Sequence, residues 1–496
     1  HDEINKAWTE LKTSLKDLSE FFKDIEIDKT KLLEICQLEL FRITALNLSG
    51  YDATVTLTNV KEASWSLEGI IFIVDVFKNE LKKEKKSSES YLKLKKSLDL
   101  AKSYLLSNTN YSSFDRLKFI TDHVEPINLS LIKLHKELNF PWTEQSALNL
   151  NSGYLFRKES FNPYFFSFEY GDTLHQKQQV ELGRLLFFDP ILSSNTSRSC
   201  ASCHNPKKAF TDGFTKSRSM DSSVLITRNA PTLLNVSLQR AFFYDGRVLQ
   251  LEQQAFDVIH NQKEMGTTLT EAVTRLRDSK EYRNLFSKAF KGREDTAITP
   301  YSVQKAITEY EKTLISFNSR FDQYLKGNKK SLNKQEINGF NLFSGKALCG
   351  SCHFFPVFNG TVPPYYNDSE FEVLGTPATN KNDEIDADLG RYNLFQLEDL
   401  KFSFKTPTVR NIELTAPYMH NGVYQDLSEV IEFYHRGGGA GLSGRPFAWG
   451  STPTGCRGSR RPPAQRDRSR RPACLRGRRA PPGAVPARTV RRDEAR

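Results

Sequence analysis

The sequence predicts a mainly α-helical protein, in which an all-helical accessory domain precedes two small domains built around a repeated cysteine motif. Apolar residues recur at three- and four-residue steps through the first 150 residues, and no β-sheet of consequence is visible. The pentapeptide Cys-x-x-Cys-His occurs twice, at 200–204 and 349–353, and loop-rich stretches follow each copy. With 496 residues, the chain is long enough for two or three domains with cores of their own.

Cys-x-x-Cys-His is the attachment sequence of a c-type haem. Its two thiols add to the haem vinyl groups as thioethers, and the adjacent His becomes an iron ligand. The alternatives are a redox disulfide or half of a zinc site, but zinc would need a second ligand pair near each motif, and we see none. We therefore predict two covalently attached haems, held by Cys200, Cys203 and His204, and by Cys349, Cys352 and His353.

Residues 1–150 predict the accessory domain. One helix face carries Trp8, Leu11, Leu15, Leu18 and Phe22, and similar patterns follow at 32–41, 91–106 and 115–138. Isolated Cys and His residues, like those found here, are typical of packing or surface positions. We therefore expect this domain to have no catalytic chemistry of its own.

The two haem domains are expected at 151–328 and 329–444. Helices are predicted before and between the motifs and after the second one, at 178–188, 251–259, 269–289, 303–326, 334–348 and 427–435. Asp426 begins a capping-box pattern that predicts the start of the last helix. Few helices and long loops suit a cytochrome c-like fold, because the haem supplies much of the core.

The net charge of +11 is confined to one end of the chain. Residues 445–496 hold 15 Arg, no Lys and three acidic residues, a net charge of +12, so the first 444 residues carry −1. This position argues against a nucleic-acid or membrane-surface role for the folded part. We expect 445–496 to be a disordered Arg/Pro-rich tail. It is either an arm for an anionic partner or a non-native, frame-shifted terminus, which the shift in composition favours.

No apolar run approaches the length of a transmembrane helix. The chain opens on His1-Asp2-Glu3 without a signal peptide. Because covalent haem attachment generally happens outside the cytoplasm, we expect a periplasmic protein whose leader is missing.

Several phrases of residues 160–444 resemble, in order, those of the bacterial di-haem cytochrome c peroxidase and MauG family. The accessory domain and the tail fall outside this resemblance. Before the first haem motif stands 181–190 (ELGRLLFFDP), and after it come 228–232 (RNAPT), 244–247 (YDGR), 252–255 (EQQA) and 264–265 (EM). The second motif is followed by 405–411 (KTPTVRN) and 416–422 (APYMHNG).

At the first haem, the resemblance implies that Glu264 moves protons to and from bound peroxide and that Gln254 lines the same pocket. Many members have a His that must leave this iron, in the stretch that reads Ser217–Asp221 here. Since that stretch has no His, and Met220 in a polar loop is a weak candidate, we expect an open coordination position.

At the second haem, the family has its far axial ligand on the helix after the phrase that contains His420. This places Tyr434 at the iron, with Met419 and His435 as alternatives. Peroxidases have Met at this position and MauG-like enzymes have Tyr. A phenolate should lower the reduction potential, whereas a thioether would favour a ferrous electron store.

Between the haems, the family has a Trp that is thought to carry electrons, and this chain has Tyr244. An aromatic relay would still be available, but phenol oxidation requires proton loss. The resemblance also implies a calcium ion held by the Asn229 side chain and the carbonyls of Thr415 and Pro417, all hard oxygen donors.

The resemblance therefore implies an oxidoreductase that reduces hydrogen peroxide at the first haem. Its electrons would come through the second haem from a small redox protein such as a cytochrome c or a cupredoxin. The alternatives are MauG-like oxidation of a side chain on a protein substrate through high-valent haem, and a non-enzymatic electron-transfer cytochrome.

Overall fold

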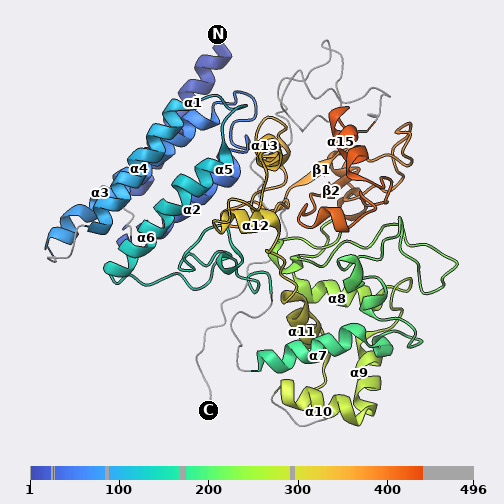
Figure 1. The fold of residues 1–496 in the computed structure, drawn as a ribbon. Coiled ribbons are helices and arrows are strands. Elements are labelled where there is room, and N and C mark those ends of the chain that lie inside the picture. Colours follow the sequence, from blue (N-terminus) through green and yellow to red (C-terminus); the bar gives the residue numbers. More distant parts are fainter. Residues whose placement is uncertain are drawn as a thin grey trace.

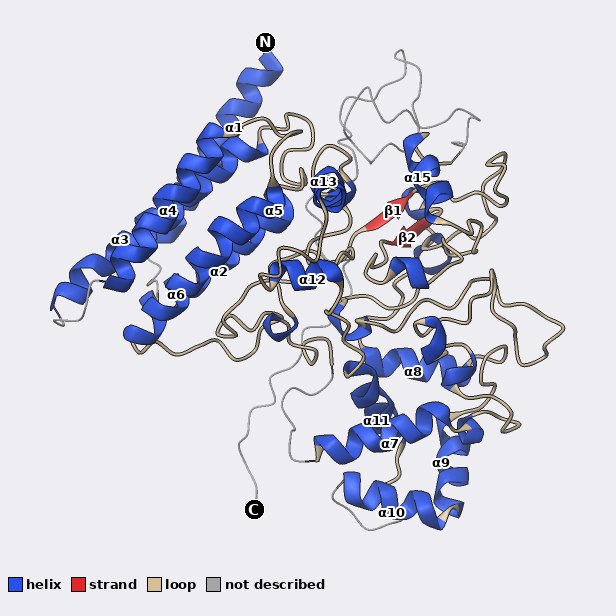
Figure 2. Ribbon diagram, viewed as in Figure 1, coloured by secondary structure: helices blue, strands red, loops and turns tan. Residues whose placement is uncertain are grey.

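The computed structural model describes residues 2–23, 26, 28–83, 89–167, 175–290 and 296–439. Its helices gather in three regions that long loops connect (Figure 1, Figure 2). Within the described part of the chain, no helix combines the length and apolar character that a membrane span requires. The tail expected at 445–496 lies outside the described residues.

The N-terminal region is a bundle in which α3 packs against α4, and α4 against α6 (Figure 1). Leu67, Leu98 and Leu131 are fully buried in its core. Two π-helical turns, η2 (Ile43–Asn47) and η3 (Ile120–Val124), extend α2 and precede α6. The helices are α1 (Asp2–Lys23), α2 (Leu32–Arg42), α3 (Asn59–Lys83), α4 (Glu89–Ser107), α5 (Arg116–Phe119) and α6 (Glu125–Glu137).

Helix α1 confirms the helix that the apolar repeat predicts, but this face is not part of the core. Trp8, Leu11, Leu15 and Leu18 are each about half exposed.

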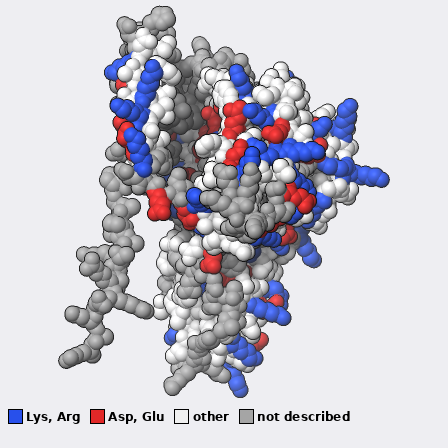
Figure 3. Space-filling model, turned by 90° about the vertical axis from the view of Figure 1, so that its left-hand side faces the viewer, with Lys and Arg blue, Asp and Glu red and all other residues white. Residues whose placement is uncertain are grey.

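On the face of the molecule in Figure 3, acidic and basic side chains are interspersed. A mixed surface of this kind creates no large field of one sign.

The second region surrounds the first cysteine motif. Helices α7 and α11 cross closely because Gly183 lies against the backbone of Ala306, where a Cβ atom would approach the carbonyl oxygen to 1.8 Å. The expected helix at 269–289 is wrong as a single element: the Ser279 side chain accepts a hydrogen bond from the Tyr282 N–H and starts a new helix. The helices are α7 (Gln176–Phe188), α8 (Leu251–His260), α9 (Leu269–Asp278), α10 (Lys280–Ala289) and α11 (Pro300–Lys312).

The third region surrounds the second motif. The expected helix at 303–326 is also two helices, because Ser319 caps a separate one, and the helix expected at 334–348 ends at Phe343. Asp426 caps the last helix as expected. The elements are α12 (Arg320–Leu325), α13 (Lys334–Phe343), β1 (Phe371–Val373), α14 (Tyr392–Phe395), β2 (Ser403–Lys405) and α15 (Leu427–His435). Strands β1 and β2 form a small antiparallel pair, with Phe371 opposite Lys405.

The N-terminal bundle and the third region share one hydrophobic core. Phe355, Val357 and Tyr366 belong to the same buried cluster as the leucines of the bundle, and the rings of Phe156 and Phe355 lie 4.7 Å apart. The helices around the first motif have a separate cluster.

A buried arginine joins the bundle to α13. The Arg116 guanidinium is 2% exposed and donates hydrogen bonds to the carbonyls of Leu48 (2.8 Å), Tyr111 (2.9 Å) and Phe114 (3.0 Å). Its backbone N–H donates to the side-chain oxygen of Asn341 on α13 at 2.9 Å. The accessory helices are therefore fixed directly to the helix that leads into the second motif.

Candidate functional site

The two Cys-x-x-Cys-His motifs adopt the same local structure. Each begins with a 3-10 turn, η6 (Cys200–Ser202) or η9 (Cys349–Ser351). In both, the His backbone N–H donates to the carbonyl of the first Cys at 2.9 Å. Because the two turns are the same, the two thiols and the imidazole have the same relative placement in both motifs.

Both imidazoles are oriented by a backbone carbonyl. His204 Nδ1 lies 3.0 Å from the Phe210 carbonyl oxygen, and His353 Nδ1 lies 2.9 Å from that of Pro407. A carbonyl can only accept, so Nδ1 carries the proton and Nε2 keeps its lone pair for a metal. Burial lowers the pKa of both side chains, which favours the neutral form that ligation requires.

The four cysteines of the two motifs form no disulfide with one another. Burial raises the pKa of Cys200 to about 12 and that of Cys203 to about 11. No group of three or more His, Cys, Asp or Glu residues that could hold a metal ion occurs among the described residues. The residues of both motifs fit a covalently attached haem.

Glu264 faces the first motif. It lies in the loop after α8 and accepts a hydrogen bond from the Asn261 side chain at 2.8 Å. Burial raises its pKa, while the Arg247 cation opposes the shift. A charge on Glu264 also raises the pKa of Cys203, which indicates that the two are close. A carboxyl with a raised pKa suits proton transfer near neutral pH.

The two other residues considered at the first motif are Gln254 and Met220. Gln254 is on α8, the helix that leads to the Glu264 loop. The Met220 N–H donates to the Lys263 carbonyl at 2.9 Å, and its sulfur lies 3.8 Å from Ser194 Oγ. Met220 thus packs along the loop that holds Glu264.

At the second motif, Tyr434 is close to the cysteines and His435 is exposed. Burial raises the pKa of Tyr434 far above the usual phenol value, and charges on Cys352, Cys349 and Glu372 raise it further. Met419 has a left-handed backbone (φ 68°) and packs in the apolar cluster around Tyr418 and Phe433.

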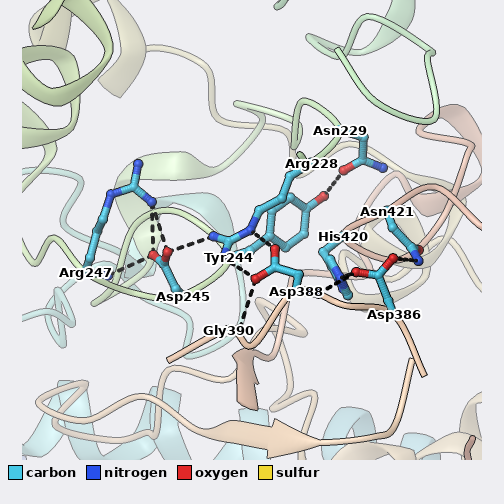
Figure 4. A network of polar contacts seen from close by, with 10 residues as sticks. All are labelled: Arg228, Asn229, Tyr244, Asp245, Arg247, Asp386, Asp388, Gly390, His420 and Asn421. Atoms are coloured by element: carbon cyan, nitrogen blue, oxygen red, sulfur yellow. Dashed lines mark hydrogen bonds and ion pairs between the residues drawn. The ribbon is translucent and has the colours of Figure 1, made fainter. Parts of the chain in front are cut away.

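A polar network joins the loop after the first motif to the segment before β2 (Figure 4). Arg228 donates to Asp388 at 2.6 and 3.0 Å and to Asp245 at 2.7 Å. His420 Nε2 lies 3.3 Å from an Asp386 carboxylate oxygen, and its ring stacks on Phe404 at 4.0 Å. The hydrogen bond from His420 is the main reason that the pKa of Asp386 lies far below its ordinary value.

Tyr244 and Asn229 form a separate pair beside this network, and the Asn229 amide connects the loop after the first motif to the 417–419 segment (Figure 4). The Tyr244 hydroxyl donates to Asn229 Oδ1, and its ring lies 6.4 Å from that of His420. The Asn229 Nδ2 donates to the carbonyls of Pro417 (3.1 Å) and Met419 (2.9 Å). In this arrangement the Asn229 amide nitrogen, and not its oxygen, faces the two carbonyls.

Reasoning from sequence missed several residues of this site. Arg228, Asp386 and Asp388 become partners only in three dimensions. Tyr51 is also new, since its hydroxyl donates to Glu370 at 2.7 Å from the opposite end of the chain. Arg228 is the first residue of the phrase at 228–232, which is the one sequence feature that pointed to any of them.

Comparisons with known proteins find similarity to one family. A family profile described as di-haem cytochrome c peroxidase matches residues 177–330. A cytochrome c551 peroxidase of Nitrosomonas europaea is 37% identical over 264 residues, covering 52% of this chain and 73% of the relative. The methylamine utilization protein MauG of Methylorubrum extorquens is 34% identical over 261 residues, covering 53% and 69%. The crystal structure of a MauG-like protein associated with microbial copper homeostasis superposes with a TM-score of 0.49 at 31% identity, covering 55% of this chain and 80% of that one.

Proposed function

Because the chain belongs to the family of di-haem cytochrome c peroxidases and MauG proteins, we propose that it reduces hydrogen peroxide at a haem held by the first motif. The second motif would hold a second haem, which would supply electron transfer from a small redox protein such as a cytochrome c or a cupredoxin. The bound haems supply peroxide binding and electron storage, and the protein supplies attachment, proton transfer and orientation.

The observation that carries this proposal is the difference between the surroundings of two equal motifs. Glu264, a carboxyl with a raised pKa, faces the first motif, whereas Tyr434 lies by the second. Glu264 takes a proton from peroxide and returns it to the departing oxygen, as a general acid–base catalyst does. Gln254 lines the same pocket, and Tyr434 completes the second site, with Met419 as the competing ligand.

A MauG-like activity, in which a protein side chain is the electron source, is the second candidate function. Tyr434 favours it, because an anionic oxygen donor stabilises the oxidised states of iron better than a thioether does. Where Tyr434 is the ligand, the second site stores oxidising equivalents rather than electrons.

Calcium at Asn229 is a further part of this proposal. Asn229 and the carbonyl of Pro417 meet between the two regions, and the Thr415 carbonyl lies two residues away along the chain. An ion there would hold the loop after the first motif against the 415–421 segment, which carries His420. We also expect the protein to act in the periplasm, where its covalent haems would be attached.

Paramagnetic resonance of the resting protein tests the proposed function. We expect a high-spin signal from the first haem, which has an open position, that disappears on addition of peroxide while peroxide is consumed. Two low-spin haems that leave peroxide untouched would refute it. Elemental analysis of the same sample for calcium, before and after chelation, tests the proposed ion.

A further inference from the structure

Tyr51 brings a phenol from the accessory bundle to the second motif. It lies just after η2, and its hydroxyl donates to Glu370 Oε1 at 2.7 Å. Its ring meets that of Phe354 edge-on, with centroids 5.1 Å apart, and Phe354 follows His353 directly. Burial, and then the charge of Glu370, raises the pKa of Tyr51 far above its usual value, and Cys352 adds to the shift.

The fit between this part of the bundle and the second motif is close on both sides. Gly50 has φ +92°, and a Cβ atom there would lie 3.0 Å from Leu348 Cδ2, next to Cys349. Across the same contact, a Cβ on Gly350 would come within 3.4 Å of Ser49 Cβ. The turn at 48–51 therefore packs against the residues on either side of Cys349, while Tyr51 is only partly buried.

Tyr51 and Tyr244 differ in the group that accepts the hydrogen bond from the phenol hydroxyl. Oxidation of a phenol by one electron releases its proton, so a tyrosine that exchanges electrons needs a base at its hydroxyl. Tyr51 has a carboxylate in that position, whereas the Tyr244 hydroxyl meets the amide oxygen of Asn229. An amide is a poor proton acceptor, so the proton of Tyr244 has no comparable destination.

We propose that Tyr51 and Glu370 form a proton-coupled redox pair through which an external donor exchanges electrons with the second haem site. This inference rests on the proposed function. Tyr51 gives one electron toward the His353 side and its phenolic proton to Glu370, which leaves a neutral tyrosyl radical and a protonated carboxyl. A one-electron donor at the surface then reduces the radical, and the proton returns to the phenol oxygen. Hydrogen peroxide is the oxidant. Tyr51 is oxidised and reduced twice for each peroxide, the surface donor supplies the two electrons, and two protons from solvent complete the two water molecules.

Rapid-freeze paramagnetic resonance of the haem-loaded protein after peroxide addition tests this pair. We expect a tyrosyl radical signal in the wild type that Tyr51→Phe removes. Tyr91→Phe is the matched control, because Tyr91 also donates to a carboxylate at 2.7 Å, that of Asp75, within the bundle. It should leave the signal unchanged.

Glu370→Gln separates proton transfer from packing. The amide oxygen of Gln still accepts the hydrogen bond from Tyr51 but does not take its proton, so the radical should form about 10²-fold more slowly. A radical signal that persists in Tyr51→Phe overturns the inference. A rate of radical formation in Glu370→Gln equal to that of the wild type also overturns it. If Tyr51→Phe fails to fold, the Glu370→Gln rate is the deciding measurement. A wild type that does not consume peroxide would instead refute the proposed function.

Discussion

Glu264 is the residue on which peroxide chemistry should depend most. We expect Glu264→Gln to lower kcat/KM for hydrogen peroxide by about 10²–10⁴-fold, because Gln cannot carry a proton. The haem absorption spectrum should stay the same. Glu281→Gln, on the exposed side of α10, is the control.

The pH profile reports on the same carboxyl. Glu264 must be ionised to accept a proton, and burial raises its pKa above the ordinary value near 4. Activity should therefore fall as the pH drops through this raised pKa, at a higher pH than an exposed carboxyl would give. Full activity in Glu264→Gln would show that another group moves the proton.

Tyr434, as the proposed axial ligand, should set the reduction potential of the second haem. We expect Tyr434→Phe to change the absorption and paramagnetic resonance of the second haem and to raise its reduction potential, because an anionic donor is lost. The first haem should be unaffected, and both should remain attached. If Met419→Leu produces this change and Tyr434→Phe does not, the ligand is Met419.

Among the elements, the contact between α5 and the turn that follows η2 depends on the Arg116 side chain, which donates to the Leu48 carbonyl. Three carbonyls accept hydrogen bonds from its side chain, which is almost fully buried. We expect Arg116→Met to lower the free energy of unfolding by about 2–4 kcal/mol, because it leaves buried acceptors without donors. Urea unfolding measures the change. Lys118→Met, at an exposed position two residues further along α5, should have little effect.

Helix ends show what local sequence can predict. The capping box at Asp426 fixes the start of α15, because its side chain satisfies N–H groups of the first turn. The break between α9 and α10 was not predicted, because the periodic pattern of 269–289 continues through it. Only the structure shows that Ser279 caps a new helix there.

In the functional site, too, local motifs can be predicted from sequence, whereas contacts made by tertiary packing cannot. Both cysteine motifs are local, so five adjacent residues sufficed to predict them. Tyr51 and Glu370 are paired only by the packing of the bundle on the third region, and no local pattern contains that information. The alternatives at Tyr434 also stay open, because the ligand depends on distances to an iron.

For the whole molecule, the division of the hydrophobic core predicts how the protein unfolds. The bundle and the third region share a cluster, and α7 to α11 have another. Trp8, Trp65 and Trp142, three of the four tryptophans of the chain, lie in the N-terminal region. We expect tryptophan emission and the spectrum of the second haem to change at the same urea concentration. Separate midpoints for these two changes would contradict a shared core.

The turn at 48–51, which packs against the second motif, has a consequence for biogenesis. The helices of the N-terminal bundle are synthesised long before Cys349 and Cys352, yet they pack against Leu348 and Gly350, the neighbours of Cys349. We therefore expect the final packing of the earliest part of the chain to depend on the maturation of one of the latest.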